Sequence, residues 1–480
     1  MPADYLLSPT QFLTLAELGT LLASRVTIRL ADDAKTRLQA GHAYLRRRLE
    51  QAPTLLGDLF QLSAPPGASR RAPDQPPPAS LLLAHAGGIG AEVPAELVRL
   101  MLLLKARSLS YGHSGVAPAT VQRLLDMYNR ELYPVVYEQG ATGIFGDSSA
   151  LAHLGLPLLL LGEVNYQGYR LAAADALSLF SWAPLSLSAP EELALLSGTQ
   201  FTLAYAVDAA LRTERLCRAA DVIGALSVTA FGGRLAFFEE RLLRLRPHAG
   251  PGVVARRLRE LLAGPELSAA NPAGAELTPY SFRCVPQVHG ASRDALAYVA
   301  QTIETECNSG TEALAIIPAD DLLLGSGNFH GQPLALALDH LALAVAGLGS
   351  ISERRTGHVL AAGPGQESGL PYSAASLVGQ NKQLSTPASL DSGGPGRADH
   401  LSLSANAATK AHRAVENTEQ LLGIELLAAR QALARQQPGR LSEVLKMVLA
   451  AFGEAGPGGR QASSADLPAA ASFVRRFDWP

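Results

Sequence analysis

Three features of the sequence predict a mainly α-helical protein with a bundle of long central helices. Apolar residues recur along most of the 480 residues at the spacing that places them on one face of a helix. Hydrophobic residues make up 48% of the chain and charged residues only 17%, which favours helices covered by other helices. The patterns at 404–437 and 334–348 are long, or apolar on nearly every face, so they need neighbouring helices and favour burial between subunits.

The order of the elements follows from the same pattern. Residues 13–51 predict two amphipathic helices around a short strand-like stretch at 26–30. A proline-rich stretch at 64–78 predicts a loop inside the domain, with a domain linker as the alternative. Beyond residue 81, helices are expected at 95–108, 119–131, 190–212, 215–230, 291–307, 334–348 and 405–437.

The chain is best treated as one continuous body with three regions. These are an N-terminal helical and loop-rich region (1–200), a central long-helix region (201–450) and a loose C-terminal tail (451–480). The tail is predicted to be loose because residues 453–466 are rich in Gly, Ala and Ser. Phe473, Phe477 and Trp479 are the candidates to tether its end, and a frayed terminus is the alternative.

Composition argues against several classes of partner. A net charge of −3 gives no electrostatic reason to bind nucleic acid or an anionic membrane. The three cysteines form no C-x-x-C pair, so neither a zinc site nor a disulfide scaffold is expected. The apolar stretches at 154–161 and 334–348 are too short to span a bilayer, and no secretory signal precedes them. We therefore expect a cytoplasmic protein without a metal.

Several segments resemble the histidine ammonia-lyase branch of the aromatic ammonia-lyase family. They occur in family order between about residues 13 and 437, and include LLLAHAGGIG at 81–90, PYSFRCVPQVHGASRDAL at 279–296, GSGNFHGQPLALALD at 325–339 and ENTEQLLGIELLAARQAL at 416–433. The resemblance implies the almost wholly helical fold of the aspartase/fumarase superfamily. It also implies a carbon–nitrogen lyase that forms a homotetramer, whose active sites are each assembled from several chains.

The segment GIFGDSSALAH at 143–153 departs from that family. In members that release ammonia from histidine, phenylalanine or tyrosine, an internal Ala-Ser-Gly cyclises to the electrophile 4-methylidene-imidazole-5-one (MIO). The glycine nitrogen attacks the alanine carbonyl, and the serine β-hydroxyl leaves as water. Here Ile144, Phe145 and Gly146 stand in place of that triad. Because Phe145 has no leaving group on its β-carbon, MIO is not expected, and no other cofactor is predicted.

Other positions that the resemblance brings over are also replaced. The inner loop that carries the family's tyrosine base should fall between 54 and 80, where this chain has no tyrosine. Ser197, Leu277 and Gln380 replace an asparagine, a glutamine and a glutamate. The candidate substrate-binding residues are therefore a mixture of retained and replaced side chains: Arg283, Tyr280, Phe329, Asn328, Gln332, Gln380, Lys382, Ser197 and Leu277.

The retained residues allow structural as well as functional interpretations. Arg283 is expected to clamp a carboxylate with help from Tyr280, and its alternative is an ion pair to a buried acidic residue. Tyr280, His85 and His330 are the candidate acid or base groups. Each of them could equally be a packed or hydrogen-bonded structural residue.

Three functions remain open from the sequence. The first is a non-catalytic or repurposed homologue that binds a small aromatic carboxylate at Arg283. The second is an MIO-independent carbon–nitrogen lyase that eliminates a trialkylamine, as the MIO-less relative ergothionase does. The third is a scaffold partner in a biosynthetic pathway, docking through the tetramer surface or the proline-rich stretch at 64–78.

Overall fold

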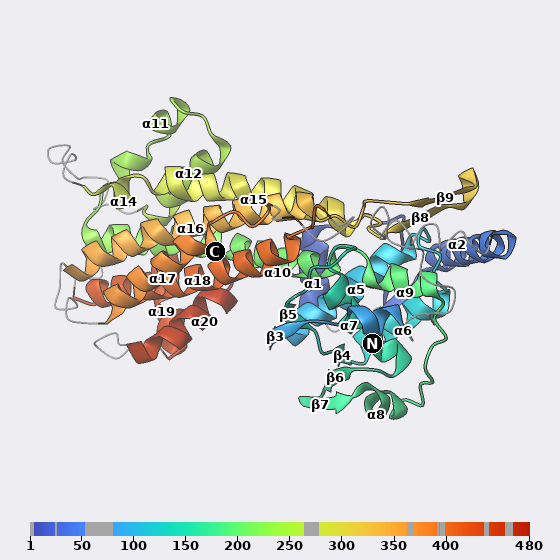
Figure 1. The fold of residues 1–480 in the computed structure, drawn as a ribbon. Helices are drawn as coiled ribbons and strands as arrows, with labels where there is room; N and C mark the ends of the chain where they lie inside the picture. Colours follow the sequence, from blue (N-terminus) through green and yellow to red (C-terminus); the bar gives the residue numbers. More distant parts are fainter. Residues whose placement is uncertain are drawn as a thin grey trace. The chain divides into compact units, whose positions relative to one another are not determined.

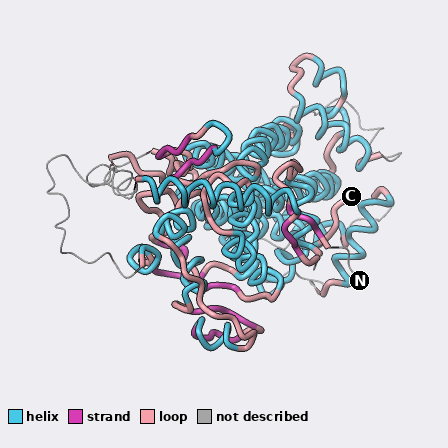
Figure 2. The backbone as a smooth tube through the Cα atoms, turned by 90° about the vertical axis from the view of Figure 1, so that its right-hand side faces the viewer, coloured by secondary structure: helices cyan, strands magenta, loops and turns pink. Residues whose placement is uncertain are grey.

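The computed structural model describes residues 4–24, 26–52, 80–263, 278–361, 369–390, 393, 399–435, 441–456 and 464–480 (Figure 1). The proline-rich stretch at 64–78 and Leu277 lie outside these residues. Helices dominate the fold and the strands are short (Figure 2). The prediction of a mainly α-helical protein is thus confirmed.

The chain divides into two compact units that are each built from separated stretches of sequence. Unit 1 comprises Met1–Asp208, Gln301–Leu336 and Pro387–Thr409, and unit 2 comprises Ala209–Ala300, Ala337–Thr386 and Lys410–Pro480. Four long helices contribute residues to both units: α10 (Gln200–Phe231), α15 (Val285–Cys307), α16 (Gln332–Ala361) and α18 (Ser404–Leu433). The predicted regions 1–200 and 201–450 therefore do not coincide with these units.

A largely apolar helix of unit 1 packs against α6 (Pro118–Asn129) and α2 (Asp32–Gln51). In α5 (Ala95–Ser110), every residue from Leu100 to Ser110 is buried. Other helices of the unit are α1 (Leu15–Ala23), α4 (Leu81–His85), α7 (Ser148–Gly155), α8 (Ala173–Ser178) and α9 (Ala189–Leu196). Thr14 begins α1 with a capping box, because its hydroxyl accepts from the amide of Glu17 while the Glu17 carboxylate accepts from the amide of Thr14.

Small sheets complete unit 1. The predicted strand at 26–30 is β2 (Ile28–Leu30), which pairs in parallel with β1 (Tyr5–Leu7). Asn129 fixes β2 because its side chain bonds both the amide and the carbonyl of Ile28. The other strands are antiparallel: β3 (Ile89–Glu92) with β5 (Tyr137–Gln139), β4 (Tyr133–Pro134) with β6 (Glu163–Tyr166) and β7 (Tyr169–Ala172), and β8 (Leu314–Ile317) with β9 (Leu322–Gly325).

Unit 2 contains the greater parts of α10, α15, α16 and α18, which are joined by buried charges. Arg355 on α16 donates to Glu425 on α18 at 2.5 Å, and both side chains are fully buried. His289 on α15 bonds Asp221 on α10 at 2.9 Å. These contacts support the predicted central bundle. The remaining helices are α11 (Glu240–Arg244), α12 (Ala249–Leu261), α14 (Tyr280–Arg283), α17 (Leu370–Leu384), α19 (Glu443–Glu454) and α20 (Leu467–Arg476).

The C-terminal region expected to be loose is helical where the structure describes it. Helix α20 carries a cluster of aromatic rings in which Phe473 stacks on Phe477 at 4.6 Å and contacts Trp479 edge-on at 5.7 Å. Trp479 is only 3% exposed, and its indole N–H donates to the carbonyl of Val474. Residues 464–480 therefore end in a packed aromatic cluster, as the tether alternative expected, and are not a loose tail.

Helix α16 is longer than the predicted apolar stretch at 334–348. Within the described part of the chain it is the helix whose length and mean hydropathy of 1.8 would allow a membrane crossing. Its most apolar window is 61% buried inside the structure, as expected for the core helix of a bundle. Packing inside the protein therefore explains the length and apolar composition of α16.

Candidate functional site

The loop at residues 143–147, where the resemblance places the family's Ala-Ser-Gly triad, is held by backbone hydrogen bonds in unit 1. The Gly143 amide donates to the Gly146 carbonyl at 2.8 Å, and the Gly198 amide donates to the Phe145 carbonyl at 3.0 Å. The Asp147 amide in turn donates to the Gly198 carbonyl at 2.9 Å. Gly146 has a φ of +86°, and a Cβ there would lie 2.4 Å from the Phe329 carbonyl oxygen. Only glycine fits this position.

The two side chains of this loop, Ile144 and Phe145, differ in how far they are buried. Ile144 is 37% exposed, whereas Phe145 is half-buried. The Phe145 ring meets the Phe329 ring edge-on, with ring centres 5.6 Å apart. The structure thus brings together two of the residues predicted from the sequence in an apolar contact.

Behind the loop lies a buried polar network that the sequence analysis missed. Lys105 on α5 is fully buried and donates to the Ser197 carbonyl at 2.7 Å, with Glu312 at 3.4 Å. Burial lowers the pKa of Lys105, and Glu312 opposes this shift. The predicted site residue Ser197 is itself fully buried, and its hydroxyl accepts from the Ala313 amide at 3.1 Å. The lone lysine within the apolar run LMLLLKARSL was the sequence signal for this network.

Asp147, directly after the triad, is the most perturbed carboxyl of this region. It is 1% exposed and accepts from both the amide and the hydroxyl of Thr202. Desolvation raises the pKa of Asp147 to about 7, the bonds from Thr202 lower it, and the nearby Glu306 raises it further. Near neutral pH the Asp147 carboxyl is therefore partly protonated.

The retained histidines of unit 1 have different partners. His330 lies 3.0 Å from His400 between ring nitrogens. His85, at the end of α4, is half-buried, and its imidazole makes no hydrogen bond to the part of the chain that the structure describes. Burial lowers the pKa of His85, so its imidazole stays neutral near pH 7. A neutral, unpaired imidazole can act as a base.

Two other predicted residues of unit 1 lie close to His330 in sequence. Gln332 donates from its side chain to the Ser389 carbonyl at 3.1 Å. Asn328 is exposed, and its amide donates to the Ser326 hydroxyl. Gln332 is therefore engaged in structure, whereas the Asn328 side chain faces solvent.

Arg283 lies in unit 2 among aromatic rings. Its guanidinium is 5.2 Å from the centre of the Phe237 ring and 5.4 Å from that of Tyr280. Among the described residues Arg283 forms no ion pair, so no buried acid of that set neutralises it. Tyr280 is 75% exposed, which argues against a helix-packing role. A cation between two rings, one of them open to solvent, suits a flat anion.

The predicted residues of α17 are also in unit 2. Gln380 accepts from Asn417 on α18 at 3.3 Å, and Lys382 is exposed.

Near Asn417 on α18, Glu416 lies within 4 Å of three arginines, at 3.8 Å from Arg212, 3.1 Å from Arg413 and 3.7 Å from Arg475. The sequence analysis missed this carboxylate, although it opens the segment ENTEQ.

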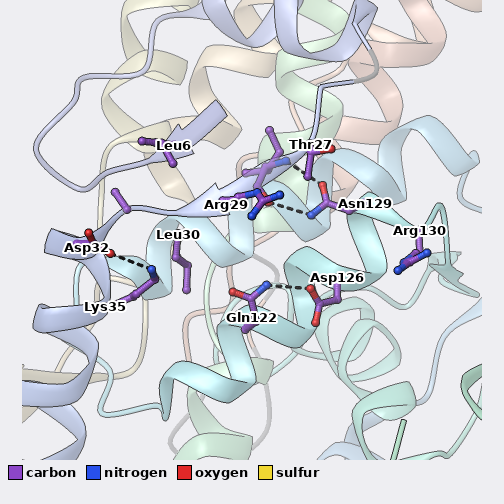
Figure 3. Close-up of a pocket in the computed structure, with 12 residues that line it drawn as sticks. Leu6, Thr27, Arg29, Leu30, Asp32, Lys35, Gln122, Asp126, Asn129 and Arg130 are labelled. Carbon is purple, nitrogen blue, oxygen red and sulfur yellow. Dashed lines mark hydrogen bonds and ion pairs between the residues drawn. The ribbon is translucent and has the colours of Figure 1, made fainter. Parts of the chain in front are cut away.

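A separate cavity of about 630 Å³ opens in unit 1 (Figure 3). It is lined by β2, the start of α2 and the polar face of α6, and none of the predicted site residues contributes to it. Its polar side chains already pair, Lys35 with Asp32 and Gln122 with Asp126, as Figure 3 shows. Within the described ranges, no group of three His, Cys, Asp or Glu side chains could hold a metal ion.

Comparison with known proteins agrees with this architecture. The family model for aromatic amino acid lyase matches residues 13–454. A histidine ammonia-lyase of Symbiobacterium thermophilum is 42% identical over 413 residues, covering 82% of each chain. The crystal structure of histidine ammonia-lyase from Trypanosoma cruzi superposes with a TM-score of 0.85 at 30% identity, covering 98% of this chain and 93% of that one.

A further solved structure shares the fold at lower identity. Ergothionase from Treponema denticola, an ergothioneine-degrading enzyme, superposes with a TM-score of 0.86 at 23% identity over 98% of both chains. At this identity the likeness concerns the fold alone. From the family model and the histidine ammonia-lyase relatives, we conclude that this chain belongs to the aromatic amino acid lyase family and is histidine ammonia-lyase-like.

Proposed function

We propose that this protein does not form MIO and has lost the elimination of ammonia that depends on it. The observation that carries this proposal is Phe145 at the position where the family's serine supplies the leaving hydroxyl. A benzyl side chain has no β-hydroxyl to expel. The Ile144-Phe145-Gly146 loop therefore does not fit the prosthetic group, and the packing of Phe145 on Phe329 supports a structural use of the ring.

The first experiment measures the prosthetic group and the activity separately. The intact mass of the purified protein should equal that calculated from its sequence, and its spectrum should lack the MIO band. Ammonia release from histidine, phenylalanine and tyrosine should be absent, with the Symbiobacterium thermophilum relative measured in parallel as the control. MIO absorbance together with borohydride-sensitive ammonia release would overturn the proposal.

The remaining function of the scaffold is binding of a small aromatic carboxylate at Arg283. The guanidinium is unpaired among the described residues and is flanked by Phe237 and Tyr280, which supports a ligand that combines an anion with a ring. Loss of the charge-assisted bond in Arg283→Ala should weaken binding of cinnamate by roughly tenfold or more.

Calorimetry with cinnamate and with neutral cinnamamide tests this site. The carboxylate should bind and the amide should not, because only the anion pairs with the guanidinium. Arg241→Ala, which removes an exposed arginine of the same unit, is the matched control and should leave binding unchanged. Equal affinities of wild type and Arg283→Ala for cinnamate would exclude this role.

The neutral, unpaired imidazole of His85 supports a second candidate, an MIO-independent elimination. In such a reaction a base takes a proton from the carbon next to the C–N bond. The bond breaks, a trialkylamine leaves with the electron pair, and a double bond forms. Turnover of a panel of betaines that disappears in His85→Asn would favour this function, and no turnover on any betaine would exclude it for the panel.

The assembly and location belong to the same proposal. We propose a cytoplasmic homotetramer, supported by the low charge content and by apolar residues on the surface of α16. The scaffold hypothesis for residues 64–78 stays a prediction. It requires that a pathway enzyme co-purifies with the full chain and is lost when those residues are deleted.

A further inference from the structure

We infer that residues 240–246 of unit 2, which form α11 and the turn after it, dock on an anionic lipid surface as a peripheral contact. We call these residues the basic tip. The whole chain has a net charge of −3, but residues 234–260 contain seven arginines and three glutamates. The average over the chain therefore conceals a basic region, and such a region is attracted to negatively charged lipid headgroups.

The first argument is that the basic tip holds more cations than the acids beside it neutralise. Glu240 pairs with Arg244 at 2.6 Å and lies 4.0 Å from Arg259. Arg241 and Arg246 are exposed and form no ion pair within the described part of the chain. A guanidinium binds a phosphate through two parallel hydrogen bonds. These two arginines are therefore free to contact lipid phosphates.

The second argument is a pair of leucines that face solvent between the arginines. Leu242 is 51% exposed and Leu245 is 83% exposed. The Leu245 amide donates to the Leu242 carbonyl, so the two side chains lie on one face of the helical turn. The order Arg-Leu-Leu-Arg-Leu-Arg at 241–246 thus brings cations and apolar side chains to the same surface. Segments that lie in a membrane interface use this combination.

The third argument is the place of the basic tip in unit 2. In Figure 1, α11 lies at the margin of the unit, beyond α12 and across the long helices from α20. Leu243 and Phe238 are buried, and the Arg259 guanidinium donates to the Phe238 carbonyl at 2.6 Å. Packing therefore holds the tip in place before it meets a partner. A lipid surface suits leucines at such a margin, because a bilayer needs no matching pocket to receive them.

Helix α19 of the same unit provides an internal comparison. Val444 and Met447 are also three residues apart, and they are 38% and 50% exposed. The charged residues beside them, Glu443 and Lys446, pair with each other at 2.7 Å. An apolar pair with balanced charges has no electrostatic attraction for anionic lipid. We therefore expect no lipid contact through this pair.

Co-sedimentation of the whole chain with vesicles tests the inference. Vesicles of phosphatidylcholine with phosphatidylserine should bind the protein, and vesicles of phosphatidylcholine alone should not. Added salt should weaken the binding, because it screens the charges. Arg241→Glu/Arg246→Glu should raise the apparent dissociation constant for the phosphatidylserine vesicles by about tenfold or more. The matched control Arg435→Glu/Arg476→Glu makes the same change in net charge at two exposed arginines elsewhere in unit 2, and it should bind like wild type.

A second pair of variants tests the apolar contribution. Leu242→Ala/Leu245→Ala should also weaken binding to the phosphatidylserine vesicles by about tenfold, because two side chains lose their contact with the acyl boundary. Val444→Ala/Met447→Ala removes an exposed apolar pair of the same spacing and should leave binding unchanged. Wild-type circular dichroism and elution volume would show that these variants are folded.

The outcomes decide between lipid and other partners. Equal binding to the two kinds of vesicle, no binding to either, or wild-type affinity in Arg241→Glu/Arg246→Glu would overturn the inference. If the vesicles are not bound but polyglutamate is, and if that binding depends on the same two arginines, the basic tip is instead a surface for an acidic protein.

Discussion

At the scale of single residues, the buried pair of Arg355 and Glu425 shows how charges are used in this fold. Arg355 is held by Glu425 through both of its ends, at 2.5 and 2.9 Å, and Ser227 donates to the same carboxylate at 2.7 Å. A buried pair adds little stability relative to apolar side chains, but an orphaned member costs a great deal. The pair therefore fixes the packing of α16 on α18 more than it stabilises it.

Arg355→Met should destabilise the protein by about 3–5 kcal/mol, because Glu425 stays buried without its cation. The double variant Arg355→Met/Glu425→Leu should recover most of that loss. Urea unfolding followed by circular dichroism measures both values. Arg354→Met, next along the helix with a 70% exposed side chain, is the control and should cost less than about 1 kcal/mol. A similar loss of unfolding free energy in Arg354→Met and in Arg355→Met would contradict this explanation.

Asp147 should make stability depend on pH. Its native pKa of about 7 lies above the usual value of 3.8, so between these values the native state holds a proton that the unfolded state has released. Stability should therefore fall as the pH rises from 4 to 7, by at most about 4 kcal/mol. Urea midpoints at pH 5 and pH 8 test this. Asp147→Asn should lose this component, and an unchanged pH dependence in the variant would assign it to other groups.

At the scale of elements, α20 closes unit 2 through its aromatic end. Trp479 and Phe473 are nearly buried, and Arg475 on the same helix bonds Glu419 of α18 at 2.9 Å. Trp479→Ala should destabilise the protein by about 3 kcal/mol, because the mutation removes a buried aromatic ring. The matched control is Tyr372→Ala, since Tyr372 is 78% exposed in the same unit. Equal urea midpoints for the two variants would mean that the packing of Trp479 in the aromatic cluster does not stabilise the fold.

The sequence predicted which segments form helices and strands better than it predicted which segments pack or pair with one another. The alternation at 26–30 identified β2, but its pairing with β1 depends on a distant segment that no local pattern reveals. The small residues at 453–466 suggested a loose tail, whereas α20 follows them with an apolar face. Local composition identifies a turn or a helix face, and tertiary packing decides whether that face is used.

The candidate site was predictable only in part for the same reason. Phe145 and Gly146 were singled out because they interrupt a recognisable segment, and in the structure the Phe145 ring meets that of Phe329. Lys105 and Glu312 went unnoticed because they are far apart in sequence, and neither interrupts a motif. The cation–π contact of Arg283 with Phe237 likewise joins separate segments. Spacing cannot reveal such partners.

At the scale of the whole molecule, the low content of charged residues, 17%, favours the proposed homotetramer, in which other subunits would cover part of the surface. Helix α16 has an exposed stripe in unit 2 formed by His340, Leu343 and Gly347. Leu343 is 52% exposed, and no atom lies within 4 Å of a Cβ built on Gly347. A glycine inside a helix costs about 1 kcal/mol relative to alanine. Close approach by a helix of a second copy would explain why it is present.

Leu343→Arg should therefore weaken the proposed homotetramer, because a charge would be buried without a partner in the interface. We expect the dissociation constant to rise by about tenfold or more, with smaller species seen by size-exclusion chromatography coupled to light scattering. Leu245→Arg is the matched control, since Leu245 is 83% exposed in the same unit but lies outside this stripe, and it should leave the tetramer intact. Unchanged circular dichroism would show that Leu343→Arg acts on assembly and leaves the fold unaltered. A tetramer that persists in Leu343→Arg at nanomolar concentration would place the subunit interface elsewhere, and the open space at Gly347 would then need another explanation.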